Sequence, residues 1–401
     1  MRPLDDILVL DLSRVLAGPY CTMQLADMGA TVIKVEEPKG GDDTRAFGPP
    51  FVGGEACYYL SVNRGKRSIA IDLKSPEGIG LVHGLAARAD VVVENFRPGT
   101  AERLGLGYPR LAEANPRLIY ASISGFGHAG LPEYFGQPGY DVVIQGLGGG
   151  PSITGEPDGE PMKSGNSIAD LLAGLLCFQG ILLALLARQR TGRGQQVDIS
   201  MLDGQVSLLS YHAGRFLNTG EVPRRMGNRH PTIVPYQTFR AADGYFNLAV
   251  GNDRLWVQFC KQIDRPELSA DARFVTNRQR VENRELLIPV LADLFATRPV
   301  AEWLALFDAA GVPAGPIYTL DQTFAHPQLL ARQMVVELPH PRAGTVRVTG
   351  CPVRLSETPA EVGPAPPLLG QHTREILREQ LGLEEAEIQR LLLAGVVKAS
   401  E

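Results

Sequence analysis

Cysteine is scarce in this sequence of 401 residues, with only five spread along the chain. None belongs to a Cys-x-x-Cys pair or lies in a cluster with histidine, which excludes the common patterns of zinc sites and disulfide frameworks. We therefore expect no metal and no disulfide, but free thiols in a cytoplasmic protein. The five residues are Cys21, Cys57, Cys177, Cys260 and Cys351.

The sequence also has no excess of positive charge and few long hydrophobic runs. Acidic residues outnumber basic ones by 44 to 39, so nucleic acid is not expected as a partner. The only candidate for a membrane span, Leu171–Ala187, is short and is interrupted by Gln179 and two glycines, which favours a buried core helix and no membrane partner. The N-terminal MRPLDDILVLDLS places acids in its only apolar run, unlike a signal peptide.

A G-x-G-x-x-G fingerprint is missing where a dinucleotide-binding fold would carry it. Residues 7–12 (ILVLDL) predict a buried strand, an Ala-Gly-Pro turn and a helix follow, and residues 31–38 (TVIKVEEP) predict a second strand. This βαβ unit indicates a Rossmann-like sheet, whereas its turn argues against a nicotinamide or flavin site.

The alternation of strand and helix continues through residues 68–126 and predicts an α/β fold with a mostly parallel sheet. Ligands bind such sheets beyond the carboxyl ends of the strands. The segments expected there are Arg14–Pro19, Lys34–Arg45, Leu73–Lys74, Asn95–Arg103 and Gly125–Asp141.

The most informative stretch of the sequence is residues 146–190, with Asp170 as its key residue. Asp170 separates a loop rich in glycine and proline from the apolar run that begins at Leu171. Its position predicts the N-cap of a helix, where a short carboxylate accepts hydrogen bonds from free backbone N–H groups. A catalytic role fits the same place, because the amides of a helix N-terminus can also hold a developing oxyanion. The residue alone does not decide between these roles.

Composition divides the chain into two domains. Residues 1–205 are predicted to form the first part of a large Rossmann-like domain, and residues 206–224 a linker. Residues 225–325 predict a smaller α+β domain with a hairpin turning at Asp243-Gly244. Residues 326–401 are predicted to return to the large domain and complete it.

Nine segments spread along nearly the whole chain match one known family in their order and spacing. They are DLSRVLAGPYCTMQLADMGATVIKVEEP, NRGKRSIAIDLKSPEG, ADVVVENFRPGTAERLGLGY, SGFGHAGL, PGYDVVIQGLGG, TGEPDGEPMKSGNSIADLLAG, TGRGQQVDISMLD, AVGNDRLW and PLLGQHTREIL. Through these segments the chain resembles the class III CoA-transferase family, which includes formyl-CoA transferase, carnitine CoA-transferase and α-methylacyl-CoA racemase. The resemblance implies a large Rossmann-like domain, a small domain, and two chains threaded through each other as an interlocked homodimer.

The resemblance implies that Asp170 is the nucleophile of a CoA transfer between an acyl-CoA and a free carboxylic acid. The carboxylate attacks the thioester, and the reaction proceeds through an aspartyl-CoA thioester, without a metal. The coenzyme A contacts that the resemblance implies are Leu16, Ala17, Ile71, Asp72, Leu73, Lys74, Asn95, Phe96, Arg97, Arg103, Pro138, Gly139, Tyr140 and Asp141.

The acid substrate is expected at Gly251, Asn252 and Asp253, which replace the glycine run of formyl-CoA transferase. Leu16 and Glu37 depart from that enzyme as well, which disfavours its formyl-CoA/oxalate specificity. Arg254 and the basic linker at residues 224–230 suit a second carboxylate, so a small dicarboxylate is expected.

Two other functions fit the resemblance. A 2-methylacyl-CoA racemase needs a second proton carrier opposite Asp170, and its GHD motif is replaced here by Gly139-Tyr140-Asp141. Tyrosine is a poor proton carrier at neutral pH, and His128 belongs to a different loop and is expected at the surface. A catalytically inactive CoA-binding protein is the third possibility. Hydroxamate formation at Asp170 with acyl-CoA and hydroxylamine would separate a transferase from both alternatives.

Overall fold

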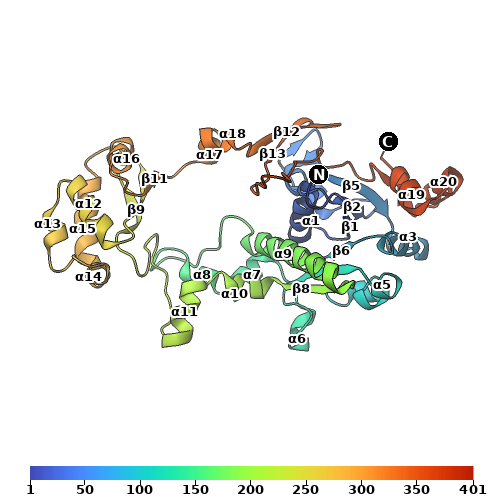
Figure 1. The fold of residues 1–401 in the computed structure, drawn as a ribbon, viewed down its shortest axis with the longest axis horizontal. Coiled ribbons are helices and arrows are strands. Elements are labelled where there is room, and N and C mark those ends of the chain that lie inside the picture. The colour runs from blue at the N-terminus through green and yellow to red at the C-terminus, as the bar shows by residue number, and fades with distance from the viewer. Residues whose placement is uncertain (401) are drawn as a thin grey trace. The chain divides into compact units, whose positions relative to one another are not determined.

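The computed structural model describes residues 1–400, which divide into two compact units. The large unit contains residues 1–150, 163–214 and 327–400, and the small unit contains residues 151–162 and 215–326. The small unit therefore begins ten residues before the predicted boundary at 225, and it also takes in the segment Pro151–Met162. Figure 1 shows the helices and strands of both units.

The large unit is built on a seven-stranded sheet with the order β14-β5-β2-β1-β6-β7-β8. Strands β5, β2, β1, β6, β7 and β8 are parallel, and β14 pairs antiparallel with β5. The predicted α/β class with a mostly parallel sheet is confirmed. The strands are β1 (Leu8–Asp11), β2 (Thr31–Glu36), β5 (Lys66–Ile71), β6 (Val91–Glu94), β7 (Ile119–Ser124), β8 (Gln196–Ser200) and β14 (Val397–Lys398).

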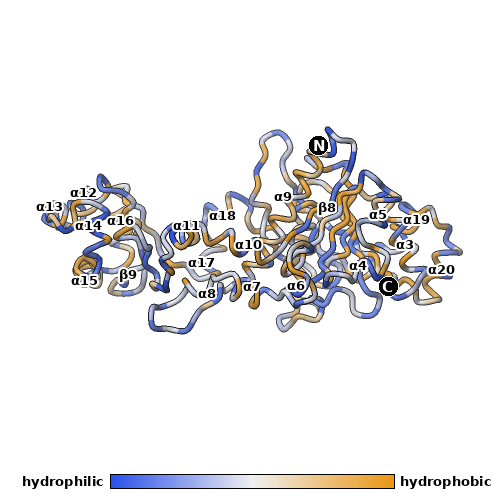
Figure 2. Tube along the Cα trace, turned by 90° about the horizontal axis from the view of Figure 1, so that it is seen from below, coloured by the Kyte–Doolittle hydropathy of each residue, from blue (hydrophilic) through white to orange (hydrophobic). Residues whose placement is uncertain are grey.

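Helices cover both faces of this sheet. Successive residues of a strand point to opposite faces, and the apolar side chains on both faces are buried under helices. Val9 of β1 lies in a core with α1 (Ala17–Asp27) and α9 (Ile168–Thr191). Its neighbour Leu10 lies in the opposite core with α3 (Pro76–Ala86), α5 (Tyr108–Ala114), α19 (Thr373–Leu381) and α20 (Glu385–Leu393). Figure 2 shows several orange stretches near the β8 label, in the region of the large unit that contains this sheet, as expected for parallel strands buried on both faces.

Helix α9 is the long helix that the apolar run predicts, and it ends at Gly192 in the left-handed conformation (φ 72°). One face is buried against the sheet and α1, where a Cβ on Gly174 would lie 2.6 Å from the Ala17 carbonyl oxygen. The opposite face exposes Leu175, Leu183 and Leu186. By length and composition alone α9 could cross a membrane, but its buried face belongs to the core of the large unit.

The remaining elements of the large unit are short helices and two separate two-stranded sheets, β12-β13 and β3-β4. Part of the glycine- and proline-rich segment predicted as a loop before Asp170 is helical, because α7 extends to Leu147 and α8 follows it. These elements are η1 (Asp43–Ala46), β3 (Phe51–Val52), β4 (Glu55–Ala56), α2 (Cys57–Val62), α4 (Thr100–Arg103), α6 (Pro132–Phe135), α7 (Asp141–Leu147), α10 (Met201–Ser207), α18 (Pro327–Ala331), β12 (Val335–His340) and β13 (Gly344–Thr349), while α8 (Gly150–Ile153) and α11 (Ser210–Thr219) cross the boundaries between the units.

The small unit packs helices on a three-stranded sheet with the order β11-β10-β9. The predicted hairpin is confirmed, with β9 and β10 antiparallel and Ala241 N donating to the Gly244 carbonyl oxygen across the turn. Its core is aromatic and contains Trp256, Phe295 and Trp303. The elements are β9 (Tyr236–Arg240), β10 (Tyr245–Ala249), α12 (Asp253–Gln262), α13 (Glu267–Ala270), α14 (Asn277–Glu282), α15 (Arg284–Phe295), α16 (Val300–Ala309), β11 (Ala314–Pro316) and α17 (Leu320–Phe324).

Candidate active site

A cavity of about 340 Å³ opens where the strand order of the large sheet reverses around β1. Ligands bind open α/β sheets at such a switch point, beyond the carboxyl ends of the strands. Asp170 lines this cavity together with the loops that follow β1, β6 and β7. The predicted contacts brought together here are Leu16, Ala17, Asn95, Phe96, Arg97, Pro138, Gly139 and Tyr140.

A second cavity of about 150 Å³ adjoins the first, and Arg14 and Phe96 line both. It lies beyond the carboxyl ends of β1, β2 and β5 and is lined by the predicted contacts Ile71, Asp72, Leu73 and Lys74. The two cavities give an elongated ligand a path from Lys74 past Phe96 to Asp170. Such a path suits a molecule with a phosphate-bearing end and a reactive end, since Lys74 offers a cation to the phosphates.

Two predicted contacts have other partners in this structure and do not line either cavity. Arg103 lies on α4, where its Nη2 donates to Thr100 Oγ1 at 2.8 Å. The carboxylate of Asp141 accepts hydrogen bonds from the first turn of α9.

Asp170 is the third residue of α9, and Ser167 occupies the N-cap. The prediction that Asp170 caps this helix is therefore wrong. A residue in the first turn has helical backbone angles, whereas an N-cap stands outside the helix. Asp141 Oδ1 performs the capping from α7, accepting from Ala169 N at 2.9 Å and from Asp170 N at 3.4 Å. The side chain of Asp170 is thus left for a role within the cavity.

The electrostatic surroundings of Asp170 favour its protonated form. Burial, followed by the negative charge of Asp141, raises the pKa of Asp170 to about 7. A carboxylate with this pKa is more basic than an ordinary aspartate and is still largely ionised above neutrality. Perturbed carboxylates of this kind, in a cleft, are frequent at catalytic sites.

Tyr58 interacts electrostatically with Asp170, which the sequence did not reveal. It lies on α2 and packs with Leu16 and Leu171 in a small hydrophobic cluster. Burial and then the charges of Asp170 and Asp141 raise the pKa of Tyr58 to about 12, so its hydroxyl keeps its proton at neutral pH. No motif marks this tyrosine, because only the folded chain brings α2 close to Asp170.

Side chains hold the backbone of the loop after β1 at Ser13, Arg14 and Val15. Asn95 pairs with Arg14 through both ends of its amide, accepting from Arg14 N at 2.9 Å and donating to Arg14 O at 2.7 Å. Val15 has a φ of 69°, which is unfavourable for a β-branched residue, and its N–H donates to the Asp42 carboxylate at 3.2 and 3.3 Å. The loop that carries Leu16 is therefore fixed before any ligand binds.

A buried ion pair supports this loop from below. Lys34 Nζ lies 2.8 Å from Asp42 Oδ2, with both side chains fully buried, and donates to the Ser13 carbonyl at 2.9 Å. Burial alone would raise the pKa of Asp42, but the charge of Lys34 and the hydrogen bonds from Lys34 and Thr44 together outweigh it and lower this pKa to about 2. Asp42 is therefore ionised at every pH at which the protein would be used.

The predicted acid-binding residues Gly251, Asn252 and Asp253 belong to the small unit. Asn252 caps α12, with its Oδ1 accepting from Leu255 N at 2.9 Å. Asp253 Oδ1 accepts from Arg280 Nη2 at 2.9 Å and from Asn277 N at 2.7 Å. Both side chains thus have structural partners.

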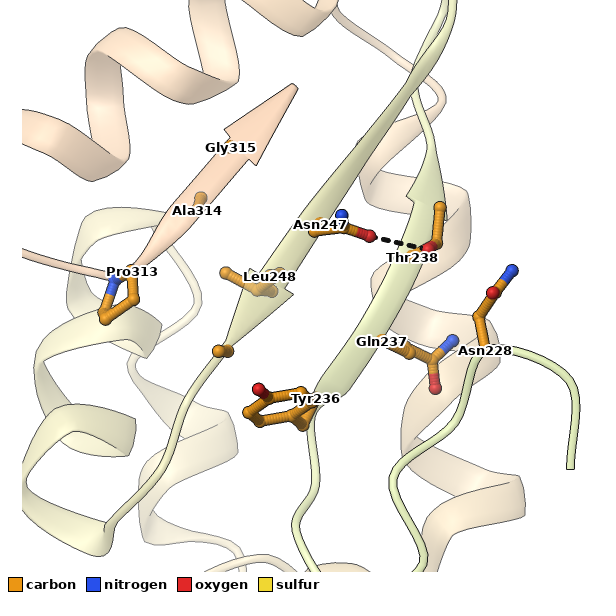
Figure 3. Close-up of a pocket in the computed structure, with 10 residues that line it drawn as sticks. Asn228, Tyr236, Gln237, Thr238, Asn247, Leu248, Pro313, Ala314 and Gly315 are labelled. Atoms are coloured by element: carbon orange, nitrogen blue, oxygen red, sulfur yellow. Dashed lines mark hydrogen bonds between the residues drawn. The ribbon is translucent and has the colours of Figure 1, made fainter. Parts of the chain in front are cut away.

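A cavity of about 470 Å³ lies on the sheet of the small unit and reaches Ala249, two residues before Gly251. The lining residues, shown in Figure 3, are either apolar or polar without a charge. Two of them form a hydrogen bond, in which Thr238 Oγ1 donates to Asn247 Oδ1 at 2.6 Å. The basic residues predicted nearby are mostly engaged. Arg225 donates to backbone carbonyls of residues 156–159, and Arg229 pairs with Glu285, whereas Arg254 is exposed in the first turn of α12.

His128 is half-buried, in contrast to the predicted surface position. Its Nδ1 lies 2.9 Å from Asp198 Oδ1, and its backbone N–H donates to the other carboxylate oxygen of Asp198. Among the described residues that line the cavity containing Asp170, none is a histidine. Among residues 1–400, no three His, Cys, Asp or Glu side chains form a metal-binding group.

Comparison with known proteins agrees with this arrangement. Residues 4–373 match the family model of CoA-transferase family III. The chain is 44% identical over 401 residues to succinyl-CoA:glutarate CoA-transferase of Mus musculus, covering 100% of this chain and 92% of the relative. It is 42% identical over 388 residues to acetyl-CoA:oxalate CoA-transferase of Acetobacter aceti, covering 96% and 97%.

A solved structure shares the fold as well as the sequence. The CAIB/BAIF family protein from Brucella suis superposes with a TM-score of 0.84 at 44% identity, covering 94% of this chain and 99% of that one. The family match spans nearly the whole chain, and both curated relatives are named as CoA-transferases. This chain therefore belongs to CoA-transferase family III, and it is an enzyme of that class.

Proposed function

We propose that this enzyme moves CoA from an acyl-CoA to a small dicarboxylate through a thioester on Asp170. The observation that carries the proposal is the position of Asp170. This carboxylate does not cap α9, has a pKa of about 7, and lies at the end of a path formed by the predicted CoA contacts. The capping by Asp141 removes the structural explanation for Asp170.

The chemistry requires two exchanges at the Asp170 carboxyl group. A carboxylate oxygen attacks the thioester carbonyl, the C–S bond breaks, and CoA leaves as a thiolate while a mixed anhydride forms. The thiolate then attacks the aspartyl carbonyl, so that the donor acid departs as a carboxylate and Asp170 becomes a thioester. The acceptor carboxylate reverses both steps and leaves as its CoA ester.

The first turn of α1 is suited to assist these attacks. Leu16 and Ala17 line the cavity with Asp170, and no side chain caps the N-terminus of α1. Free backbone N–H groups at a helix start stabilise negative charge on a carbonyl oxygen. The fixed loop at Ser13–Val15 keeps these donors in place without reorganisation during the reaction.

A dicarboxylate is favoured because both curated relatives described above are named for acids with two carboxyl groups, glutarate and oxalate. A second carboxylate calls for a cation, and Arg14 and Arg97 line the cavity while Arg254 is exposed on the small unit. Oxalate, which the sequence departures disfavoured, is a candidate again through the relative that uses it.

Exposed apolar side chains support the proposed homodimer. Val142 and Leu147 of α7 and Leu183 of α9, all in the large unit, are each more than half exposed in the single chain. Apolar surface of this kind on a soluble protein marks a protein–protein interface. We propose that a second copy covers it, in the interlocked arrangement implied by the family resemblance, and light scattering of the purified protein would report the dimer mass.

The test is a panel of free acids offered with succinyl-CoA or acetyl-CoA, with the CoA esters identified by mass spectrometry. Succinate, glutarate and oxalate are expected to be converted, and Asp170→Asn is expected to abolish conversion while the fold survives. Transfer confined to monocarboxylates would contradict the substrate class, and near-normal transfer by Asp170→Asn would contradict the nucleophile.

A further inference from the structure

The first turn of α9 is tied to α7 by a chain of hydrogen bonds that passes through Asp141. One carboxylate oxygen, Oδ1, caps Ala169 N and Asp170 N. The other, Oδ2, accepts from Gln145 Nε2 at 2.7 Å. Gln145 is only 2% exposed, and its Oε1 accepts from Ser164 N at 2.9 Å. Asp141 is therefore held rigidly against the backbone of Asp170.

Capping alone does not require a charge at this position. Asparagine and serine cap helices about as well as aspartate, because each offers an oxygen to the same N–H groups. An aspartate here adds a negative charge directly beside the proposed nucleophile, where it opposes ionisation of Asp170. This arrangement costs stability in the resting enzyme, so the charge requires an explanation beyond the cap.

We propose that Asp141 is a positioning residue that also destabilises the ionised form of Asp170, and thereby favours the state in which Asp170 is esterified. The inference rests on the proposed function. In the resting enzyme Asp170 is a carboxylate, and two negative charges lie side by side. In the aspartyl-CoA thioester the Asp170 carbonyl is neutral, and the charge has left with the released donor acid.

The balance of the exchange shows where this repulsion acts. Enzyme carboxylate and acyl-CoA are converted into enzyme thioester and free carboxylate. One C–S bond and one C–O bond are broken, and one bond of each kind is formed. The total charge is unchanged, but the negative charge moves from Asp170 to the departing acid. Repulsion by Asp141 is therefore relieved by formation of the thioester and is restored when the thioester is consumed.

The other groups that face Asp170 do not cancel this effect. Tyr58 of α2 keeps its proton and is neutral. Arg14 and Asp43 on the cavity wall form an ion pair with each other at 3.5 Å. Arg97 lines the same cavity, yet the pKa of Asp170 stays raised, with Asp141 as the charged neighbour that raises it.

The matched variants are Asp141→Asn, which keeps a capping oxygen and removes the charge, and Gln145→Met, which keeps the charge and loosens its support. Asp141→Ser provides a second neutral cap. The purified full-length enzyme is equilibrated with succinyl-CoA and succinate, and the ratio of thioester to free enzyme is measured by intact mass over a range of pH. The acid limb of kcat/KM is recorded in parallel.

We expect Asp141→Asn to lower the thioester ratio by about tenfold at about pH 8.5 and to move the acid limb down by about one pH unit, since one unit corresponds to tenfold. The difference from the wild type should vanish at pH values where Asp170 is protonated in both proteins. Gln145→Met should not move the acid limb downward. A purely structural role would change the rate without this pH signature.

Two results would overturn the inference in distinguishable ways. If the wild type forms a thioester and both neutral caps leave the ratio and the acid limb unchanged, the inference is wrong and the proposed function stands. If the wild type forms no thioester at any pH, the proposed function is wrong and the inference falls with it.

Discussion

The buried pair of Lys34 and Asp42 gives a quantitative prediction about the loop beside Asp170. Both side chains are fully buried and their charged atoms lie 2.8 Å apart. Removing one partner leaves the other charge in the interior, so we expect Asp42→Asn or Lys34→Met to reduce the free energy of unfolding by about 3–5 kcal/mol. The double variant should lose less than the sum, by about 1–3 kcal/mol, because neither charge remains.

Urea unfolding followed by far-UV circular dichroism is the suitable assay. Trp256 and Trp303 both belong to the small unit, so tryptophan fluorescence does not report directly on this pair. The pKa of Asp42 is lowered to about 2 from 3.8, so its contribution is complete above about pH 4 and is lost as the pH falls toward 2. The difference between wild type and Asp42→Asn should shrink in that range.

The same substitution should affect the ligand, because Val15 N donates to the Asp42 carboxylate while Leu16 and Ala17 line the cavity. Release of Val15 from its left-handed conformation should raise the KM for acyl-CoA in the variant. The reasoning would be refuted if the double variant lost as much stability as the two single variants together. It would also be refuted if Asp42→Asn left the urea midpoint unchanged.

Three further predictions concern other parts of the molecule. Asp170→Asn should raise the free energy of unfolding at about pH 8.5 by on the order of 4 kcal/mol, because the folded pKa of about 7 exceeds the ordinary 3.8 and makes ionisation costly; urea titration should show the gain vanish below about pH 4. Gly139→Ala should weaken acyl-CoA binding measured by calorimetry, because its Cβ would lie 2.2 Å from Gly125 Cα; unchanged affinity would contradict the tight contact. Asp253→Ala should destabilise the small unit by about 1–3 kcal/mol in fluorescence-detected unfolding, because the buried Arg280 loses its carboxylate partner, and an unchanged midpoint would contradict a structural role.

The sequence predicted the elements whose signals are local. Buried parallel strands appear as continuous apolar runs, and the turn at Asp243-Gly244 has residues that favour a hairpin. The site could be located in outline because ligands bind beyond the carboxyl ends of the strands, and most predicted contacts line two adjoining cavities there.

The features that the sequence missed depend on contacts between distant segments. Asp141 caps α9 although it precedes Asp170 by 29 residues. Capping rules consider only the residues next to the helix, so they could not reveal this contact. Tyr58 is close to Asp170 only through the packing of α2. Strand β14 was missed because its two residues are ordered by pairing with β5 and carry no periodicity.

Isolation of the covalent intermediate tests the central claim most directly. The enzyme is incubated with acyl-CoA, and one sample is analysed by intact mass while another is treated with hydroxylamine and digested. The account predicts a mass increase equal to CoA less one water, a hydroxamate on the peptide that contains Asp170, and neither product with Asp170→Asn. An unmodified wild-type enzyme that still transfers CoA, or an adduct on any other residue, would contradict the account.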